Sequence, residues 1–161
     1  KLEELDKLLG EQNTVLVVKL HPFQDQSRIG AVGMKHIVLL DNETLVDQDI
    51  QINQILGLAD GLISDYSSAA VDYLLLDRPM GFTLEDVEEY RESRGFVFDN
   101  IRDWLPGAEI VSFHDFCRFV TEIGQGLDST GEKRQRLKAI MHDYSDDQSC
   151  RRIAEALQIH P

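Results

Sequence analysis

The chain has 161 residues, enough for one domain with a substantial hydrophobic core. Hydrophobic residues make up 42% of it and charged residues 28%, the balance of an ordinary globular protein. Its 29 acidic and 16 basic residues give a net charge of −13, and the basic residues form no cluster. We therefore expect no binding to nucleic acid, and no anchoring of this segment on an anionic membrane surface.

The sequence shows no targeting segment. No apolar run approaches the roughly 20 residues that cross a bilayer, and the first residues lack the layout of a signal peptide. The chain starts with lysine rather than methionine, so we expect it to begin inside a longer protein. Its two cysteines, Cys117 and Cys150, fit no zinc or CxxC spacing, and so few thiols are typical of a reducing compartment.

Apolar residues alternate along the chain between helical spacing and short β-branched runs. In chain order, the predicted elements are a helix at 2–9 that Gly10 ends, strands at 14–20 and 36–40, a helix at 52–59, a strand at 61–64, a helix at 67–76, a strand at 79–83, a helix at 84–92, a brief strand at 110–111, and helices at 113–123, 131–142 and 148–157. Ser112 and Asp115 are typical of an N-terminal cap. Strands separated by helices predict an α/β fold with a parallel sheet covered on both faces.

A histidine follows the first predicted strand, in Lys19-Leu20-His21-Pro22. Ligands of α/β sheets bind at the carboxyl ends of strands, which is where His21 falls. Because imidazole titrates near neutral pH, His21 is a candidate general acid or base, or a phosphate ligand when protonated. The alternative is a histidine that only caps a turn.

A serine-rich turn follows the third predicted strand, in Ser64-Asp65-Tyr66-Ser67-Ser68, and opens a helix. The N-terminus of a helix carries unpaired N–H groups and a partial positive charge, and serine hydroxyls add further donors for a phosphate. Asp65 would repel a phosphate directly, so we expect it to orient its neighbours or to bind a hydroxyl. The alternative is an ordinary helix cap, because serine and aspartate are preferred there.

Together these segments resemble the family of CDP-glycerol:poly(glycerophosphate) glycerophosphotransferases. In that family an apolar strand runs into Lys-x-His-Pro, and a later Ala/Ser-Asp-x-Leu-Ile-Thr-Asp-Tyr-Ser-Ser stretch opens a helix; the counterpart here is 58–69 (LADGLISDYSSA). The similarity covers most of the chain from about Val15. It continues through Asp72-Tyr73, Arg78-Pro79, Asp86, Glu89-Tyr90, Arg94-Gly95-Phe96, Pro106-Gly107 and Ser149–Ile153.

The resemblance implies a GT-B architecture, in which two Rossmann-like domains face each other across a cleft. Residues 1–161 would be a single Rossmann-like domain, the C-terminal half, with a parallel sheet covered by helices on both faces and the nucleotide donor bound to it. The partner N-terminal domain, with the acceptor site and a second essential histidine beside His21, would lie outside this chain. We expect a cytoplasmic protein at the inner face of the cell membrane, with any membrane association through other parts of the full-length protein.

The resemblance also assigns roles to individual residues. Asp86 and Glu89 fall in the acidic segment after the fourth predicted strand, where either could hold the ribose hydroxyls. Arg94 would face a phosphate, or would pair with Glu89 or Asp86 on a solvated helix. Ser64 stands where the family often has threonine, a change that keeps the hydroxyl. Four residues are placed around the donor's phosphates: Ser64, Asp65, Ser67 and Ser68.

The implied reaction transfers glycerol phosphate, or another polyol phosphate, from a CDP-linked donor to a hydroxyl of a growing teichoic-acid or capsule-type polymer. CDP-glycerol or a similar CDP-polyol would be the substrate, with no further cofactor. One alternative is the donor domain of a GT-B glycosyltransferase that uses a nucleotide sugar. Another is a non-catalytic domain that serves assembly or polymer binding.

The other histidines and the aromatic residues receive structural interpretations. No HExxH or paired-carboxylate pattern is present, so we expect no metal site. Four aromatic residues are expected in the core rather than stacked on a nucleobase: Phe82, Phe96, Phe98 and Trp104.

Overall fold

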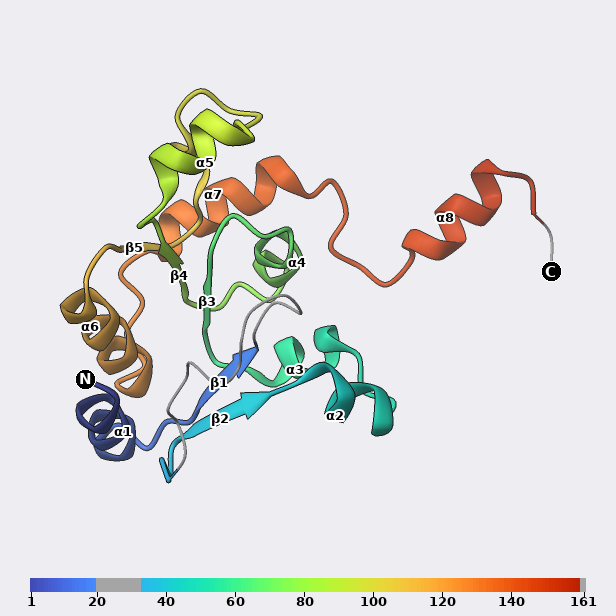
Figure 1. Cartoon of the computed structure of the whole chain (residues 1–161). Coiled ribbons are helices and arrows are strands. Elements are labelled where there is room, and N and C mark those ends of the chain that lie inside the picture. The colour runs from blue at the N-terminus through green and yellow to red at the C-terminus, as the bar shows by residue number, and fades with distance from the viewer. Residues whose placement is uncertain (20–32, 160–161) are drawn as a thin grey trace.

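The computed structural model describes residues 1–19 and 33–159 (Figure 1). In chain order the elements are α1 (Leu2–Glu11), β1 (Leu16–Lys19), β2 (Ile37–Leu40), α2 (Asn42–Asp47), α3 (Ile52–Leu58), β3 (Leu62–Ser64), α4 (Ala69–Leu74), β4 (Met80–Thr83), α5 (Val87–Ser93), the 3-10 helix η2 (Ile101–Trp104), β5 (Ala108–Ile110), α6 (Phe113–Gly124), α7 (Gly131–Met141) and α8 (Ser149–Ala156). Each predicted helix and strand therefore has a counterpart.

Some boundaries and elements differ from the prediction. α1 continues through Gly10, and the chain turns only at Asn13, whose φ is 49°. α2 and η2 were not predicted. In α2 only Leu45 is buried, so no apolar stripe marks the helix in the sequence. Its N-terminal signal was present, because the Asp41 carboxylate accepts the N–H of Thr44 at 2.6 Å. The predicted Ser112 cap is confirmed by its bond from the Asp115 N–H.

All strand pairs in the described residues are parallel. β1 pairs with β2 in the register Leu16↔Ile37, and β4 lies between β3 and β5, with Leu62 opposite Met80. The predicted α/β class is confirmed, because parallel strands alternate with helices that flank them. The described strands nevertheless form two sheets, β1-β2 and β3-β4-β5, where one continuous sheet was expected.

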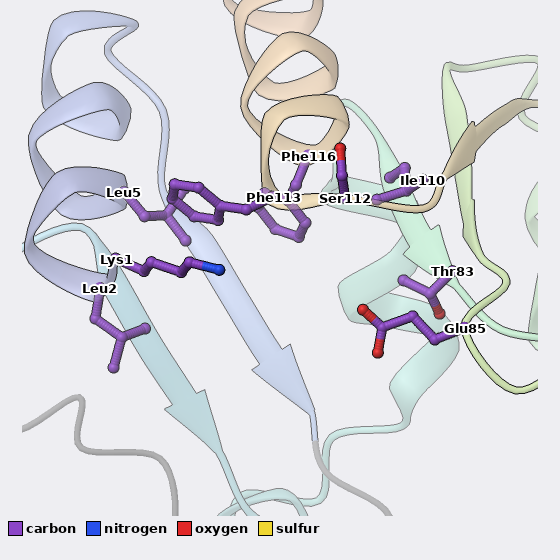
Figure 2. Close-up of a pocket in the computed structure, with 9 residues that line it drawn as sticks. All are labelled: Lys1, Leu2, Leu5, Thr83, Glu85, Ile110, Ser112, Phe113 and Phe116. Carbon is purple, nitrogen blue, oxygen red and sulfur yellow. The ribbon is translucent and has the colours of Figure 1, made fainter.

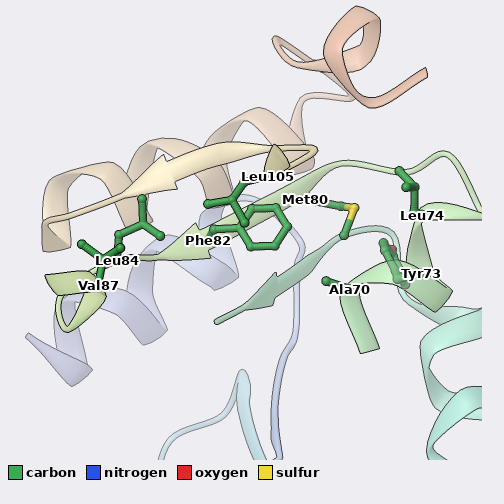
Figure 3. Packing of buried hydrophobic residues seen from close by; sticks show 8 residues of the cluster. All are labelled: Ala70, Tyr73, Leu74, Met80, Phe82, Leu84, Val87 and Leu105. Atoms are coloured by element: carbon green, nitrogen blue, oxygen red, sulfur yellow. The ribbon is translucent and has the colours of Figure 1, made fainter. Parts of the chain in front are cut away.

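Helices cover both faces of the three-stranded sheet. Successive residues of a strand point to opposite faces. Met80 and Phe82 of β4 pack on one face with Tyr73 of α4 in a buried cluster (Figure 3). Gly81 points to the other face, where a Cβ would come within 3.4 Å of the Phe119 ring on α6. α4 therefore covers one face, with α7 packed on it, and α6 covers the other (Figure 1).

α1 covers the two-stranded sheet and also contacts α6. Its carboxylate at Asp6 accepts the backbone N–H groups of His36 at 2.7 Å and Lys35 at 2.9 Å, which fixes the chain as it enters β2. The bond from the His36 N–H is the largest cause that lowers the pKa of Asp6, and the bond from Lys35 acts in the same direction. A small buried cluster joins the three elements: Leu5, Leu9, Ile37 and Val120.

A buried ion-pair network ties α7 to the turn between α4 and β4. The Arg134 side chain is 3% exposed, and its Nε donates to Asp77 Oδ1 at 2.8 Å. A second nitrogen, Nη2, lies 2.5 Å from Asp128 Oδ2 and also donates to the Asp77 carbonyl. Hydrogen bonds and the positive charge of Arg134 lower the pKa of Asp128. Both carboxylates are needed because a guanidinium without partners would be costly to bury.

Two residues of the family-like motifs have a structural role. The hydroxyl of Tyr73, on α4, donates to the Ala59 carbonyl at 2.8 Å. Arg78 donates to the same carbonyl at 2.6 Å and to the Gly57 carbonyl at 3.1 Å. These bonds hold the end of α3 against α4, and they set the start of β3.

α8 projects away from the body of the molecule (Figure 1). None of its residues is buried; Ile153 is 59% exposed, and Leu157, which follows the helix, is 64% exposed. Arg152 of this helix pairs with Asp146 at 2.5 Å and lies over the Tyr144 ring at 3.8 Å. Among residues 1–19 and 33–159, no helix has both the length and the apolar character needed to cross a membrane.

Replacement of Arg134 by methionine should lower the free energy of unfolding by roughly 3 kcal/mol, because Asp77 and Asp128 lose the cation that they share. Urea denaturation measures the effect. Arg136→Met on the same helix is the matched control: Arg136 is exposed, and its loss should change stability by no more than about 0.5 kcal/mol. Equal stability of the two variants would contradict the role of Arg134.

Candidate functional site

The serine-rich turn lies at the carboxyl end of β3, where it was predicted. Ser64 is the last residue of the strand, and its carbonyl accepts a long bond of 3.4 Å from the Thr83 hydroxyl of β4. Asp65 accepts the Ser67 N–H at 2.9 Å and so holds the turn in shape. The expectation that Asp65 orients its neighbours is met. Ser67 and Ser68 are exposed at the surface.

The start of α4 offers fewer free donors than predicted. The helix is only six residues long, and the N–H groups of Ala70 and Val71 already bond to the Ser67 and Ser68 carbonyls. The Ala69 N–H donates to the Ser67 hydroxyl at 3.4 Å. A phosphate here would therefore rely mainly on the serine hydroxyls. Ser68 occupies the cap position without a capping bond from its side chain, so ordinary capping does not explain this residue.

A tyrosine joins the serine turn to the acidic segment after β4. The Tyr66 hydroxyl donates to Asp86 Oδ1 at 3.2 Å. Burial, followed by the charge of Asp86 and the bond to it, raises the pKa of Tyr66 to about 12. Tyr66 is therefore a neutral donor at physiological pH. A carboxylate has about four lone-pair sites, so Asp86 keeps capacity for a ligand hydroxyl.

Tyr66 belongs to an aromatic cluster that it forms with residues of α5 and of the turn after it. The Tyr66 ring lies 4.9 Å from Tyr90 and 5.0 Å from Phe96, and Tyr90 and Phe96 stack on each other at 5.0 Å. Gly95 makes the stack possible, since its φ of 74° ends α5 in a left-handed turn that brings Phe96 back onto Tyr90. Arg94 lies beside the cluster, with its guanidinium 5.9 Å from the centre of the Tyr90 ring.

The structure thus brings most of the predicted residues to one place. Asp86 occupies the N-cap position of α5, although its side chain makes no capping bond. Glu89 lies near the start of this helix and Arg94 at its end, and all three residues are exposed. Among the described ion pairs, Arg94 contacts neither Glu89 nor Asp86, and the pair on this helix is Arg91 with Glu88 at 2.6 Å. The solvated-pair alternative for Arg94 is therefore not observed. His21 lies outside the described residues.

Sequence reasoning assigned no role to Tyr66, Tyr90 or Arg102. The charge of Arg102 acts on the Tyr66 hydroxyl and opposes the rise of its pKa, which brings a second cation to this region. Arg102 also pairs with Glu109, and its carbonyl accepts a bond from Lys133 at 2.8 Å. A signal for the tyrosines was available, because both stand inside the family-like motifs.

The aromatic residues divide between core and surface. Phe82 is 1% exposed and lies in the core, as predicted, and Phe96 packs against that core from the side. Phe98 and Trp104 are half-buried and stack on each other, with ring centres 3.9 Å apart. They are not part of the buried clusters, so their prediction as core residues is wrong.

A pocket of about 320 Å³ lies elsewhere at the carboxyl ends of β4 and β5 (Figure 2). None of the described predicted site residues lines it. Its walls come from the start of α1, from the strand ends and from the start of α6: Lys1, Leu2, Leu5, Thr83, Glu85, Ile110, Ser112, Phe113 and Phe116. In the described part of the chain, no three histidine, cysteine or acidic side chains are grouped to hold a metal ion.

The model of the family CDP-Glycerol:Poly(glycerophosphate) glycerophosphotransferase matches residues 1–158. The chain belongs to this family. The resemblance first seen in the Lys-x-His-Pro and Ser-Asp-Tyr-Ser-Ser motifs is therefore confirmed, and the match extends over the N-terminal helix as well.

Relatives in this glycerophosphotransferase family are teichoic acid enzymes. The teichoic acid ribitol-phosphate primase of Bacillus spizizenii is 26% identical over 160 residues, which is 96% of this chain and 37% of the primase. The teichoic acid poly(ribitol-phosphate) polymerase of the same organism is 44% identical over 97 residues, 60% of this chain and 14% of the polymerase. The chain therefore spans well under half the length of these relatives.

The fold is similar to that of a wall teichoic acid polymerase, TagF. A histidine-to-asparagine variant of TagF superposes with a TM-score of 0.73 at 22% identity, over 98% of this chain and 37% of that one. The same variant soaked with CDPG gives a TM-score of 0.68 at 21% identity, over 96% of this chain and 37% of that one. At this level of identity the likeness establishes the fold alone.

The Tyr66–Asp86 contact predicts an unusual tyrosine titration. Tyr66 should ionise near pH 12, and Asp86→Asn should lower its pKa toward 10 without reaching it, because burial is the larger cause. The difference in tyrosinate absorbance between the protein and its Tyr66→Phe variant isolates this residue. Because the raised pKa belongs to the folded state, the stabilisation it brings is present below pH 10 and is lost as the pH rises toward 12.

Glu89→Gln is the matched control for that titration, since Glu89 is not among the main causes of the raised Tyr66 pKa. It should leave the Tyr66 pKa unchanged. A Tyr66 pKa that Asp86→Asn leaves unchanged would show that the contact with Asp86 does not persist in solution.

Proposed function

We propose that this chain is the donor-binding domain of a transferase that moves glycerol phosphate, or another polyol phosphate, from a CDP-linked donor to a growing teichoic-acid or capsule-type polymer. Membership of the glycerophosphotransferase family and the teichoic acid names of the relatives support this reaction. The TagF structure soaked with CDPG supports a CDP-linked donor. The proposed reaction needs no cofactor beyond the donor.

The observation that carries the proposal is the contact between Tyr66 and Asp86. It places exposed hydroxyls, those of Ser67 and Ser68, on one side of a tyrosine and an exposed carboxylate on the other. A nucleoside diphosphate presents the matching groups in the same order, with phosphate oxygens that accept hydrogen bonds and ribose hydroxyls that donate them. Asp65 holds the turn in shape, Ser64 joins it to β4, and Arg94 adds a cation beside Tyr90 of the aromatic cluster.

The transfer is a displacement at phosphorus. A hydroxyl oxygen of the polymer attacks the phosphorus of the polyol phosphate, the bond from that phosphorus to the bridging oxygen breaks, and CMP leaves with the bonding electrons. The attacking hydroxyl must lose a proton, and the departing CMP must have its charge stabilised. We assign one of these tasks to His21, which follows β1 as the serine turn follows β3.

The acceptor site belongs, in this proposal, to a second domain. The chain covers 37% of the ribitol-phosphate primase, so a relative of that length has room for another domain. We propose that this chain is the C-terminal half of a GT-B pair, with Asp86 or Glu89 at the ribose. The full-length protein would work at the inner face of the cell membrane, held there by parts outside this chain.

Removal of two hydroxyls tests the phosphate site. Ser67→Ala with Ser68→Ala should weaken CDP binding to the full-length protein about tenfold or more, since each lost bond to a charged phosphate costs roughly 1.5–3 kcal/mol. Stability should fall by no more than about 1 kcal/mol. Calorimetric titration measures affinity, and Ser149→Ala on α8 serves as the control. Unchanged CDP affinity would show that these serines do not bind the phosphate and only form the turn.

The same titration with UDP and GDP separates the proposal from its alternatives. Preference for CDP supports a CDP-polyol donor, whereas preference for uridine or guanosine would indicate a nucleotide-sugar glycosyltransferase. Failure of the full-length protein to bind any of the three would indicate a non-catalytic domain.

His21→Ala in the full-length enzyme should reduce turnover by about 10²–10⁴-fold, the usual contribution of a general acid or base. Donor affinity should change little, because the contribution is made in the transition state. His114→Ala is the control, since His114 is exposed at the start of α6. Steady-state kinetics with CDP-glycerol measures both quantities, and a normal kcat would remove His21 from the mechanism.

A further inference from the structure

Asp86 departs from a local rule at the start of α5. It occupies the N-cap position, where an aspartate side chain normally accepts one of the first free N–H groups of the helix. Here its backbone carbonyl accepts the Tyr90 N–H at 2.8 Å, but its carboxylate makes no capping bond. The chain uses such bonds elsewhere, because the side chains of Asp41 and Ser112 both cap their helices. The Asp86 carboxylate is therefore directed away from its own helix.

The carboxylate faces the hydroxyl of Tyr66 instead. That hydroxyl donates to Asp86 Oδ1 at 3.2 Å, across a separation of 20 residues. Of the hydrogen bonds in the described part of the chain, it is the only one that reaches this carboxylate. A bond from a hydroxyl to a carboxylate is usually about 2.5–2.7 Å long. The contact with Tyr66 is therefore loose, and it orients the carboxylate without saturating it.

The position of the Tyr66 hydroxyl is fixed by its ring and its backbone. Tyr90 and Phe96 pack against the ring, with ring centres 4.9 and 5.0 Å away. The backbone belongs to the turn that Asp65 holds through the Ser67 N–H. Because burial above all raises its pKa to about 12, the Tyr66 hydroxyl keeps its proton and remains a donor at neutral pH. Tyr66 is therefore suited to orient a carboxylate.

We propose that Tyr66 is a positioning residue of the donor site: its hydroxyl holds the Asp86 carboxylate away from α5 and toward the donor, where this carboxylate accepts hydrogen bonds from a vicinal diol. This role rests on the donor site proposed above and makes it more specific. A carboxylate has about four lone-pair sites, so it can accept both hydroxyls of a diol and still keep the bond from Tyr66. A CDP-polyol has a vicinal diol on each side of its diphosphate, one on the ribose and one on the polyol.

The same geometry separates Asp86 from Glu89, the other candidate for a hydroxyl ligand. The backbone carbonyl of Glu89 accepts the Ser93 hydroxyl at 2.8 Å, within its own helix. In the described part of the chain, no hydrogen bond links the Glu89 carboxylate to the serine turn. An exposed glutamate without such a link would lose rotamer freedom when a ligand binds, which costs free energy. Asp86 is already oriented before the ligand arrives.

The preference between paired ligands tests this role. Calorimetric titration of the full-length protein with CDP and 2′-deoxy-CDP reports a diol on the ribose, and titration with CDP-glycerol and CDP reports a diol on the polyol. In one of these pairs, the parent protein should bind the ligand with the additional diol about tenfold or more tightly, because hydrogen bonds to a charged group are strong. Asp86→Asn should remove most of that preference. Tyr66→Phe keeps the ring and its packing, and it should reduce the preference about threefold or more while affinity for the ligand without the diol stays within about twofold.

Glu92→Gln is the matched control, because Glu92 is exposed on the same helix and its replacement should leave the preference unchanged. A Tyr66→Phe protein with the full preference of the parent would overturn the role of Tyr66. Loss of the preference in Glu89→Gln rather than in Asp86→Asn would also overturn it, and would assign the diol to Glu89. CDP binding with no preference in either pair would overturn this inference alone, whereas failure to bind any of these ligands would overturn the proposed function as well.

Discussion

The geometry of the candidate site depends on one buried cation. Of the charged residues that the structure describes, only Arg134 is buried, and its two carboxylate partners, Asp77 and Asp128, both precede it in the sequence. Asp77 stands in the turn between α4 and β4, so the ion pair fixes where the helix ends and where the central strand begins. The serine turn at one end of α4 and the acidic segment after β4 are placed by that junction. A site made of exposed hydroxyls and carboxylates is thus held by a contact beyond the opposite end of α4.

Much of the fold follows from local patterns, and the rest depends on contacts between distant segments. Short apolar runs separated by helical stripes predict the parallel strands, and Ser112 marks the start of α6 correctly. Such patterns do not say which strands are neighbours, so the separation of β1 from β3 was not foreseen. α2 lacks an apolar stripe, and Phe98 with Trp104 looks like core because composition cannot tell a stacked surface pair from a buried one.

The site was predicted more completely than its internal contacts. Motif positions located the serine turn and the acidic segment, and both lie at the carboxyl ends of parallel strands. The role of Tyr66 as the link between them depends on a side chain that crosses from one loop to another over a separation of 20 residues. No periodicity encodes such a contact. The start of α4 has fewer free N–H donors than the sequence predicted, because its first amides already have partners inside the turn.

α8 has a different relation to the rest of the chain. The contacts described for it reach back only to Asp146 and Tyr144, and none of its side chains is buried. An eight-residue helix with so few supports is marginal in water. We therefore expect this segment to melt on its own, and to contribute helical signal to a circular dichroism spectrum without sharing in the cooperative transition of the core. We expect limited proteolysis to remove it while the remainder stays folded.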